Sequence, residues 1–196
     1  MRVYDFVVVG GGLVGMAVAC GLARRGLSIA VADEGDIAHR AARGNFALVW
    51  VHGKGGGFPR YASWTRTSAD LWPTFAEELH DRTGINIAYS KRGAVHICFS
   101  DDEMAKQRAR LELVAAEAEP SNINPGVEFE MLDRPSLDKL IPGLGPDVIG
   151  ASFSAMDGHC NSLRLHEALL KCFLSLDGDY LPNHRVVKIN PKRHGF

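Results

Sequence analysis

The chain has 196 residues, of which 46% are hydrophobic and 23% are charged, and its formal net charge at pH 7 is −1. This composition is that of an ordinary globular protein with enough apolar residues to bury a core. A nearly neutral chain has no general attraction for nucleic acid or for an anionic membrane surface, so neither is expected as a partner.

The N-terminal segment combines a short apolar strand with closely spaced glycines. Residues 4–9 have the composition of a central strand in a parallel sheet. In the GxGxxG spacing that follows, Gly10 allows a tight turn, Gly12 lets a pyrophosphate approach the backbone, and Gly15 lets the next helix lie close to the strand. That helix, predicted over residues 13–25, directs its free N–H groups at the phosphates. The pattern predicts a dinucleotide site.

A second predicted strand, residues 28–32, leads into an acidic pair. Asp33 stands where a carboxylate can accept hydrogen bonds from ribose hydroxyls, which argues against a 2′-phosphate, and Glu34 adds a second negative charge. Residues 6–23 lack charges and also raise the alternatives of a membrane helix or a signal peptide. The register of strand, glycines, helix, strand and acid favours an adenine dinucleotide instead.

The remainder of the chain is predicted to alternate helices and strands. An apolar segment at 46–51 leads through a glycine-rich turn into a long helix over 59–83. The residues of that helix expected in the core are Leu71, Trp72, Phe75 and Leu79. The further expected elements are strands at 84–89 and 93–99, a helix at 101–119 capped by Ser100, strands at 127–132 and 148–154 around a short helix at 135–140, a helix at 161–176 that buries Leu163, Leu165, Leu169, Leu170 and Phe173, and a strand at 186–189.

The end of the chain and its cysteines carry separate expectations. A strand at 186–189 needs a partner, and the sequence stops at Phe196, which suggests a C-terminally truncated fragment.

The four cysteines have no CxxC spacing and the histidines are dispersed, so neither a metal site nor a redox dithiol is predicted. A reduced, cytoplasmic protein is the simplest interpretation.

The pattern resembles the D-amino-acid oxidase-like superfamily of FAD-dependent oxidoreductases, which includes glycine oxidase and sarcosine oxidase, over essentially the whole chain. Residues 40–51, RAARGNFALVWV, look most like the branch with the flavin subunits of opine oxidase, D-hydroxyproline dehydrogenase and hydrogen cyanide synthase. The resemblance implies an α/β fold with a Rossmann-like FAD-binding domain, formed by residues 1–83 and 155–196 and incomplete. Residues 84–154 are then part of an inserted α+β substrate domain.

The resemblance also implies which residues contact the FAD cofactor. These are Gly10, Gly12, Leu13, Val14 and Gly15 at the pyrophosphate, Asp33 and Glu34 at the ribose, Arg40, Ala41, Ala42, Asn45, Phe46 and Ala47 along the pyrophosphate towards the isoalloxazine, and Val186 at the adenine. Some of these residue types fit plainer roles: a solvated loop for Arg40, a turn or helix cap for Asn45, and an ordinary strand position for Val186. Asp157-Gly158-His159 resembles the family's return from the substrate domain, with Ser162 where a proline is common.

The implied activity is oxidation of the C–N bond of a small amino or imino acid by hydride transfer to flavin N5. His52 is a candidate base or hydrogen-bond donor and Lys54 a candidate for attracting a carboxylate, although polar loop roles fit both residues. The branch implies that the chain has partner subunits in a heteromeric dehydrogenase. Attachment of this chain to the periphery of the inner membrane is expected only through those subunits. The alternative is a non-catalytic fragment with only the adenine side of the site. An NAD-dependent enzyme and a flavin disulfide reductase are disfavoured by the loop after Asp33 and by the missing dithiol.

Overall fold

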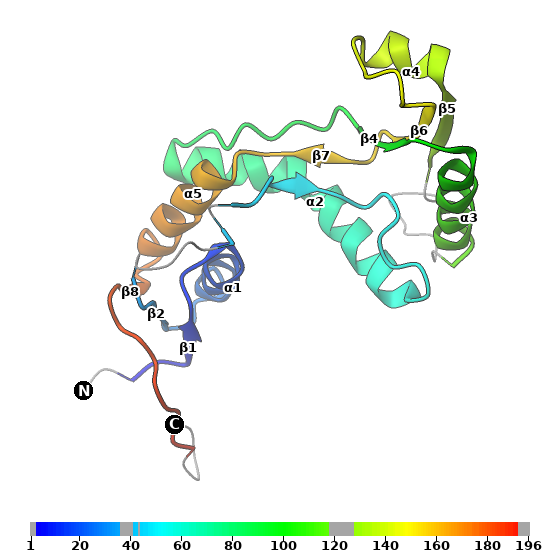
Figure 1. Cartoon of the computed structure of the whole chain (residues 1–196). Coiled ribbons are helices and arrows are strands. Elements are labelled where there is room, and N and C mark those ends of the chain that lie inside the picture. Colours follow the sequence, from blue (N-terminus) through cyan, green and yellow to red (C-terminus); the bar gives the residue numbers. More distant parts are fainter. Residues whose placement is uncertain (1–2, 36–40, 43, 118–127, 192–196) are drawn as a thin grey trace. The chain divides into compact units, whose positions relative to one another are not determined.

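The computed structural model describes residues 3–35, 41–42, 44–117 and 128–191, and these residues form two compact units (Figure 1). Unit 1 comprises residues 1–47, 76–88 and 161–196, and unit 2 comprises residues 48–75 and 89–160. The predicted FAD-binding and substrate domains are functional assignments with other boundaries, and they stay predictions.

Unit 1 is built on a parallel sheet with the strand order β1-β2-β8. The strands are β1 (Phe6–Val9), β2 (Ile29–Ala32) and β8 (Asp179–Leu181), with Phe6 opposite Ile29 and Ala30 opposite Asp179. The central strand is therefore β2, which is fully buried. We expected residues 4–9 to be central, but in the part of the chain that the structure describes β1 is an edge strand with exposed apolar side chains.

Two helices pack together in unit 1, α1 (Leu13–Ala23) and α5 (Ser162–Leu174) (Figure 1). The buried side of α1 carries small side chains such as Ala19 and Ala23, which permit a close approach of the neighbouring helix. Residues 6–23, which raised the possibility of a membrane helix, are divided between β1, the glycine turn and α1. Among the described residues, no helix has the length and apolar character needed to span a bilayer.

The long helix α2 (Pro59–Thr83) has the predicted bounds, but one of the four residues expected in its core is exposed. Leu79 is buried and Trp72 packs against the cluster of Val49, Val51 and Met156. Leu71, predicted in the core, is exposed because it lies off the apolar stripe of the helix.

Unit 2 holds a second sheet that is antiparallel throughout, with the order β4-β6-β5. Its elements are β4 (Ala94–Cys98), α3 (Asp101–Glu117), β5 (Glu130–Asp133), α4 (Arg134–Leu140) and β6 (Gly150–Ser154). The cap predicted at Ser100 is present, since its hydroxyl accepts the N–H of Glu103 at 3.2 Å. A short pair, β3 (Leu48–Val49) with β7 (Gly158–His159), completes the unit.

Two predicted strands do not form. Residues 84–89 run as irregular chain, with Gly84 and Ala88 in the left-handed region, and only a bridge between Ser90 and His159 follows. Residues 186–189 have no strand partner among the described residues, and Val187 is 86% exposed. The strand that joins β2 is instead β8, which sequence analysis missed because its three residues, DYL, carry little strand signal.

The face of α5 also differs from prediction at one position. Leu165, Leu169 and Phe173 are buried as expected, and Leu170 is half-buried. Leu163 is exposed, because it lies in the first turn of α5 on the side that borders a cavity described below.

Candidate functional site

The turn from β1 into α1 requires glycine at two positions. Gly10 has a φ of +100°, in the left-handed region. A Cβ on Gly15 would lie 1.9 Å from the carbonyl oxygen of Gly10, so any larger residue must push α1 away from the turn. Gly12 is the N-cap of α1, and no described side chain caps the helix there. Its first N–H groups are therefore available to an anion, which the helix dipole also favours.

Asp33 ties this turn to the chain that follows β2. Its side chain is only 5% exposed, and Oδ2 accepts the N–H of Gly11 at 2.6 Å while Oδ1 accepts the N–H of Gly35 at 2.9 Å. A carboxylate can accept about four hydrogen bonds, so these two bonds are compatible with a ligand hydroxyl as a further donor. Binding of a ribose by Asp33 stays a prediction. Its neighbour Glu34 is exposed, 3.7 Å from Nε of Arg185.

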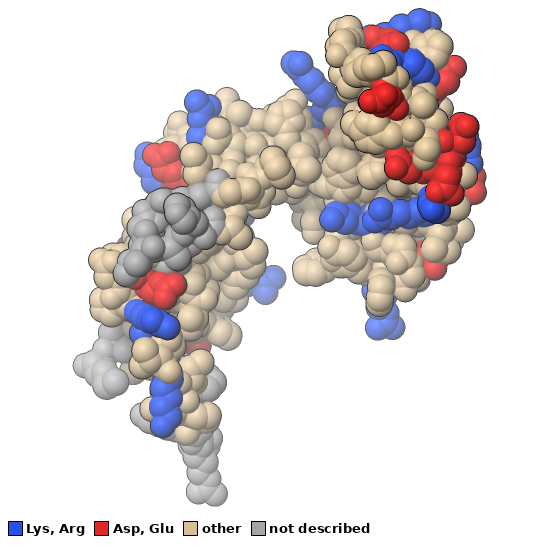
Figure 2. Space-filling model, viewed as in Figure 1, with Lys and Arg blue, Asp and Glu red and all other residues tan. Residues whose placement is uncertain are grey.

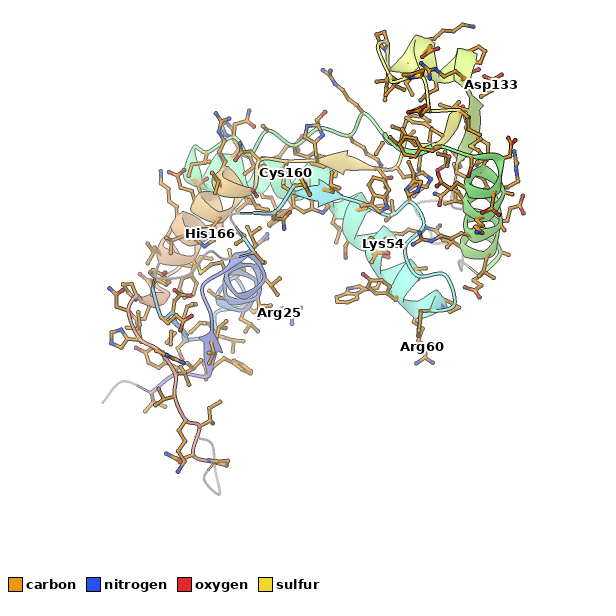
Figure 3. All side chains as sticks on the ribbon, viewed as in Figure 1. Arg25, Lys54, Arg60, Asp133, Cys160 and His166 are labelled. Atoms are coloured by element: carbon orange, nitrogen blue, oxygen red, sulfur yellow. The ribbon has the colours of Figure 1, made fainter. Side chains whose placement is uncertain are left out.

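The opposite side of the turn is held by His166, which sequence analysis missed. Nε2 of His166 lies 2.6 Å from the carbonyl oxygen of Gly11, and because a carbonyl only accepts, Nε2 carries the proton. Figure 3 labels His166 on α5. The signal available in the sequence was its spacing: His166 follows Leu163 by three positions, which places the two on one side of the helix.

A cavity of about 380 Å³ opens between the glycine turn, α5 and the segment after β8. Its volume falls in the usual range of small-molecule sites. Its lining residues are Gly11, Gly12, Asp33, Gly35, Ala42, Leu163, His166, Tyr180, Pro182 and Asn183. The segment after β8 is fixed by Asp33 too, because its backbone carbonyl accepts the N–H of His184 at 2.7 Å.

The other predicted contact residues are placed differently. Ala42 borders the cavity, and Leu13 is partly buried at the start of α1. Val14, Ala41 and Val186 are exposed and do not line the cavity. Arg40 lies outside the described residues.

The segment that begins at Asn45 has a constrained backbone. Phe46 is 86% exposed, whereas Ala47 is buried and has a φ of +53°, which is costly for a residue with a Cβ. The side-chain oxygen of Asn45 accepts the N–H of Ala47, and its carbonyl accepts the hydroxyl of Ser162 at 3.3 Å. Ser162 is the first residue of α5, after the Asn161 cap, where a proline is also well tolerated.

In unit 2, a buried carboxylate organises the residues after β3. Oδ1 of Asp157 accepts the N–H of Val51 at 2.7 Å and the N–H of His52 at 3.0 Å. The next residue must be small, because a Cβ on Gly158 would lie 2.5 Å from the carbonyl of Ser90. These contacts give a physical reason for aspartate followed by glycine at this point of the chain.

His52 is enclosed beside the same carboxylate. Its Nδ1 lies 3.5 Å from Oδ2 of Asp157 and both side chains have no exposed surface. The ring stacks on Trp50, with the centroids 5.5 Å apart. His52 as a catalytic base stays a prediction; in the structure its ring is fully buried beside Asp157.

Unit 2 also has two surface hollows. One, of about 280 Å³, is lined mainly by aromatic and apolar side chains, including Trp50, Trp64 and Trp72. The other, of about 460 Å³, lies along the glycine-rich loop and includes Lys54 and Arg110, whose guanidinium donates to the carbonyl of Gly53 at 2.9 Å. Figure 3 shows Lys54 on that loop, and Figure 2 shows acidic side chains gathered over α3.

No group of three or more histidine, cysteine or acidic side chains in the described ranges has the arrangement of a metal site.

Comparisons with known proteins agree over nearly the whole chain. A model of the family described as DAO, FAD dependent oxidoreductase, matches residues 5–196. A subunit of opine oxidase from Agrobacterium tumefaciens (strain Ach5) is 43% identical over 193 residues, which are 98% of this chain and 51% of that protein. The chain spans about half the length of the curated relatives it matches.

Two solved structures show the same fold. Glycine oxidase from Bacillus cereus ATCC 14579 aligns with a TM-score of 0.80 and 23% identity over 97% of this chain and 49% of that one. L-alpha-glycerophosphate oxidase from Mycoplasma pneumoniae, with FAD bound, aligns with a TM-score of 0.80 and 16% identity over 98% of this chain and 48% of that one. The fold is therefore the Rossmann-like flavoprotein fold that the sequence predicted.

Proposed function

Because the chain belongs to the DAO family of FAD-dependent oxidoreductases, we propose that it forms the adenine side of the flavin site in an enzyme that oxidises the C–N bond of a small amino or imino acid. The observation that carries this proposal is the cavity at the glycine turn, where Asp33 and His166 hold Gly11 from two sides.

The residues of this cavity fit the adenosine diphosphate part of FAD. The uncapped start of α1 and the turn at Gly10–Gly12 suit the pyrophosphate, because free N–H groups and the helix dipole both favour negative charge. Asp33 suits the ribose hydroxyls, and Tyr180 and Asn183 offer an aromatic ring and an amide near the adenosine. We propose these residues, with Ala42 and His166, as the holders of that half of the cofactor.

When bound, FAD supplies the hydride acceptor for C–N oxidation. The contribution of this chain is to orient the cofactor and substrate on a prearranged backbone. Asn45 fixes Ala47 at the start of the segment 45–52, and Asp157 fixes Val51 and His52 at its end. Each of these two anchor points restrains the backbone within its own unit, and a restrained backbone helps to hold reacting groups in position. We assign His52 a positioning role within this support, since its ring is enclosed beside Asp157.

The substrate and partners are proposed from the curated relative. Its name, which describes one subunit of an opine oxidase, favours an opine or another small amino or imino acid as substrate and at least one further subunit as partner. The hollow with Lys54 and Arg110 offers positive charge for a substrate carboxylate. We propose a cytoplasmic location, with the membrane reached only through partner subunits.

A second candidate is a non-catalytic polypeptide that binds only the adenine side of the dinucleotide. The observation that favours it is the cavity at the glycine turn, whose residues fit the adenosine diphosphate part of the cofactor and not the flavin ring. Binding and catalysis therefore need separate measurements.

The experiment uses this chain and a chimera in which the second half of the Agrobacterium relative follows residue 196. Calorimetry with ADP, FAD and NAD measures binding, and visible absorbance with dye reduction by opines, D- and L-proline, hydroxyproline, glycine and sarcosine measures activity. We expect this chain to bind ADP, and the chimera to be yellow and to reduce the dye. ADP binding with an inactive chimera would favour the second candidate. A colourless chimera that binds NAD would overturn the flavoenzyme proposal.

A further inference from the structure

Two of the four cysteines lie in contact where α1 packs against α5. The sulfur atoms of Cys20 and Cys172 are 2.8 Å apart, and the two residues are 3% and 2% exposed. Both belong to unit 1, although 152 positions separate them in the chain. Sequence spacing gave no hint of this pair, because it arises only from the packing of two distant helices.

We propose that Cys20 and Cys172 form a reversible disulfide that links α1 to α5. A disulfide sulfur pair is about 2.05 Å apart, so the two sulfurs need to approach by less than about 1 Å. Each cysteine lies in the last turn of its helix, and helix ends open locally more readily than helix centres. Fraying of these turns gives a small oxidant access to sulfurs that are otherwise covered.

The surroundings of the pair favour one thiolate and one thiol. The hydrogen bond between Cys172 and Cys20, in which either sulfur can be the donor, lowers the pKa of the Cys172 thiol to about 7. Arg82 and Arg24 add to the lowering, and burial and Glu78 oppose it. The same hydrogen bond raises the pKa of Cys20. Because a thiolate is the attacking form of cysteine, Cys172 is the expected nucleophile.

The oxidant we propose is a small hydroperoxide. The Cys172 thiolate attacks the peroxide, so that an S–O bond forms, the O–O bond breaks and hydroxide leaves, taking up a proton as water. The sulfur of Cys20 then attacks the Cys172 sulfenic acid: the S–S bond forms, the S–O bond breaks, and the Cys20 proton departs with the hydroxyl as a second water. The two sulfurs together lose two electrons, and one hydrogen peroxide becomes two waters.

The other two cysteines provide an internal control. Cys98 and Cys160 lie in unit 2, and neither has a cysteine contact among the described residues. Burial raises the pKa of both thiols, for Cys160 to about 11. They are buried like the pair, so a difference in oxidation reports the pairing rather than exposure.

The test treats the purified, reduced chain with stoichiometric hydrogen peroxide, denatures it in an alkylating reagent and identifies the cysteine peptides by mass spectrometry. We expect a Cys20–Cys172 cross-linked peptide that dithiothreitol releases, with Cys98 and Cys160 still alkylated. The rate of cross-linking should rise between pH 6 and pH 8, because the lowered pKa of Cys172 makes its thiolate fraction rise over that range.

Variants make the pairing specific. Cys20→Ser should abolish the cross-link and leave Cys172 as a sulfenic acid that a dimedone probe traps, whereas Cys98→Ser should leave the cross-link unchanged. The wild-type measurement needs no variant and stands even if Cys20→Ser is unstable. The proposal is overturned if all four thiols stay alkylatable, if Cys98 or Cys160 is oxidised as fast as the pair, or if Cys172 is oxidised without linking to Cys20.

Discussion

Replacing Asp33 by alanine tests whether one carboxylate holds the glycine turn in place. The change removes two hydrogen bonds to a charged acceptor, from Gly11 at 2.6 Å and from Gly35 at 2.9 Å. Each such bond contributes roughly 1.5–3 kcal/mol, so the two together contribute about 3–6 kcal/mol to the free energy of unfolding. Water that enters the space left by the carboxylate can accept from the freed N–H groups, so we expect a loss near the smaller figure. A small domain is stable by about 5–15 kcal/mol, so the effect is large.

Asp33→Asn separates the contributions of the two hydrogen bonds to the free energy of unfolding. The amide oxygen can keep one of the two bonds, while the amide nitrogen faces an N–H group that it cannot accept, so we expect about half of the alanine effect. Urea unfolding followed by circular dichroism gives the free energy, and calorimetry with ADP gives the ligand affinity. Glu34→Gln is the matched control for the unfolding measurement, because this exposed side chain lies 3.7 Å from Arg185 and surface pairs contribute less than about 1 kcal/mol. Unchanged unfolding and ADP binding in Asp33→Ala would refute the role of the carboxylate.

Two further predictions concern single helices. Gly15→Ala places a Cβ 1.9 Å from the carbonyl oxygen of Gly10, so we expect a loss of about 1–3 kcal/mol in urea unfolding and at least tenfold weaker ADP binding on calorimetry. Gly21→Ala in the same helix meets nothing within 4 Å and should stabilise the chain by about 0.5–1 kcal/mol; equal effects of the two changes would contradict the steric argument. Asp133 caps α4, and hydrogen bonds from the hydroxyl and N–H of Ser136 hold the pKa of this carboxyl below its ordinary value of 3.8. Because the pKa of this carboxyl is lower in the folded than in the unfolded state, the cap makes its full contribution to the free energy of unfolding above pH 3.8. That contribution is lost as the pH falls through the folded-state pKa. Urea midpoints against pH should therefore fall less steeply below pH 3.8 in Asp133→Asn than in the wild type.

The start of the fold could be predicted because its signals are local. The apolar run before Gly10, the glycine spacing and the position of Asp33 all lie within one β-α-β unit, where each residue type has a direct steric or electrostatic reason. The long helix was equally clear, since Pro59 is typical of a first helical position and apolar residues recur at helical spacing after it.

The cavity could not be completed from the sequence because its far side comes from distant segments. His166, Tyr180 and Asn183 lie more than a hundred positions beyond the glycines, and only the packing of α5 and the pairing of β8 with β2 bring them together. Strand propensity misled us in the same region: residues 186–189 have the composition of a strand, but pairing depends on a neighbour and not on composition.

The outer edge of β1 has a practical consequence for every solution experiment on this chain. Phe6, Val7 and Val9 are exposed beside a row of backbone groups that pair with no described strand. Such an edge is a template for adding a strand from another molecule, so self-association should increase with protein concentration. Binding curves should be recorded at several protein concentrations, with light scattering measured on the same samples. An affinity measured on an aggregating sample would be an average over monomers and aggregates and not the affinity of the cavity.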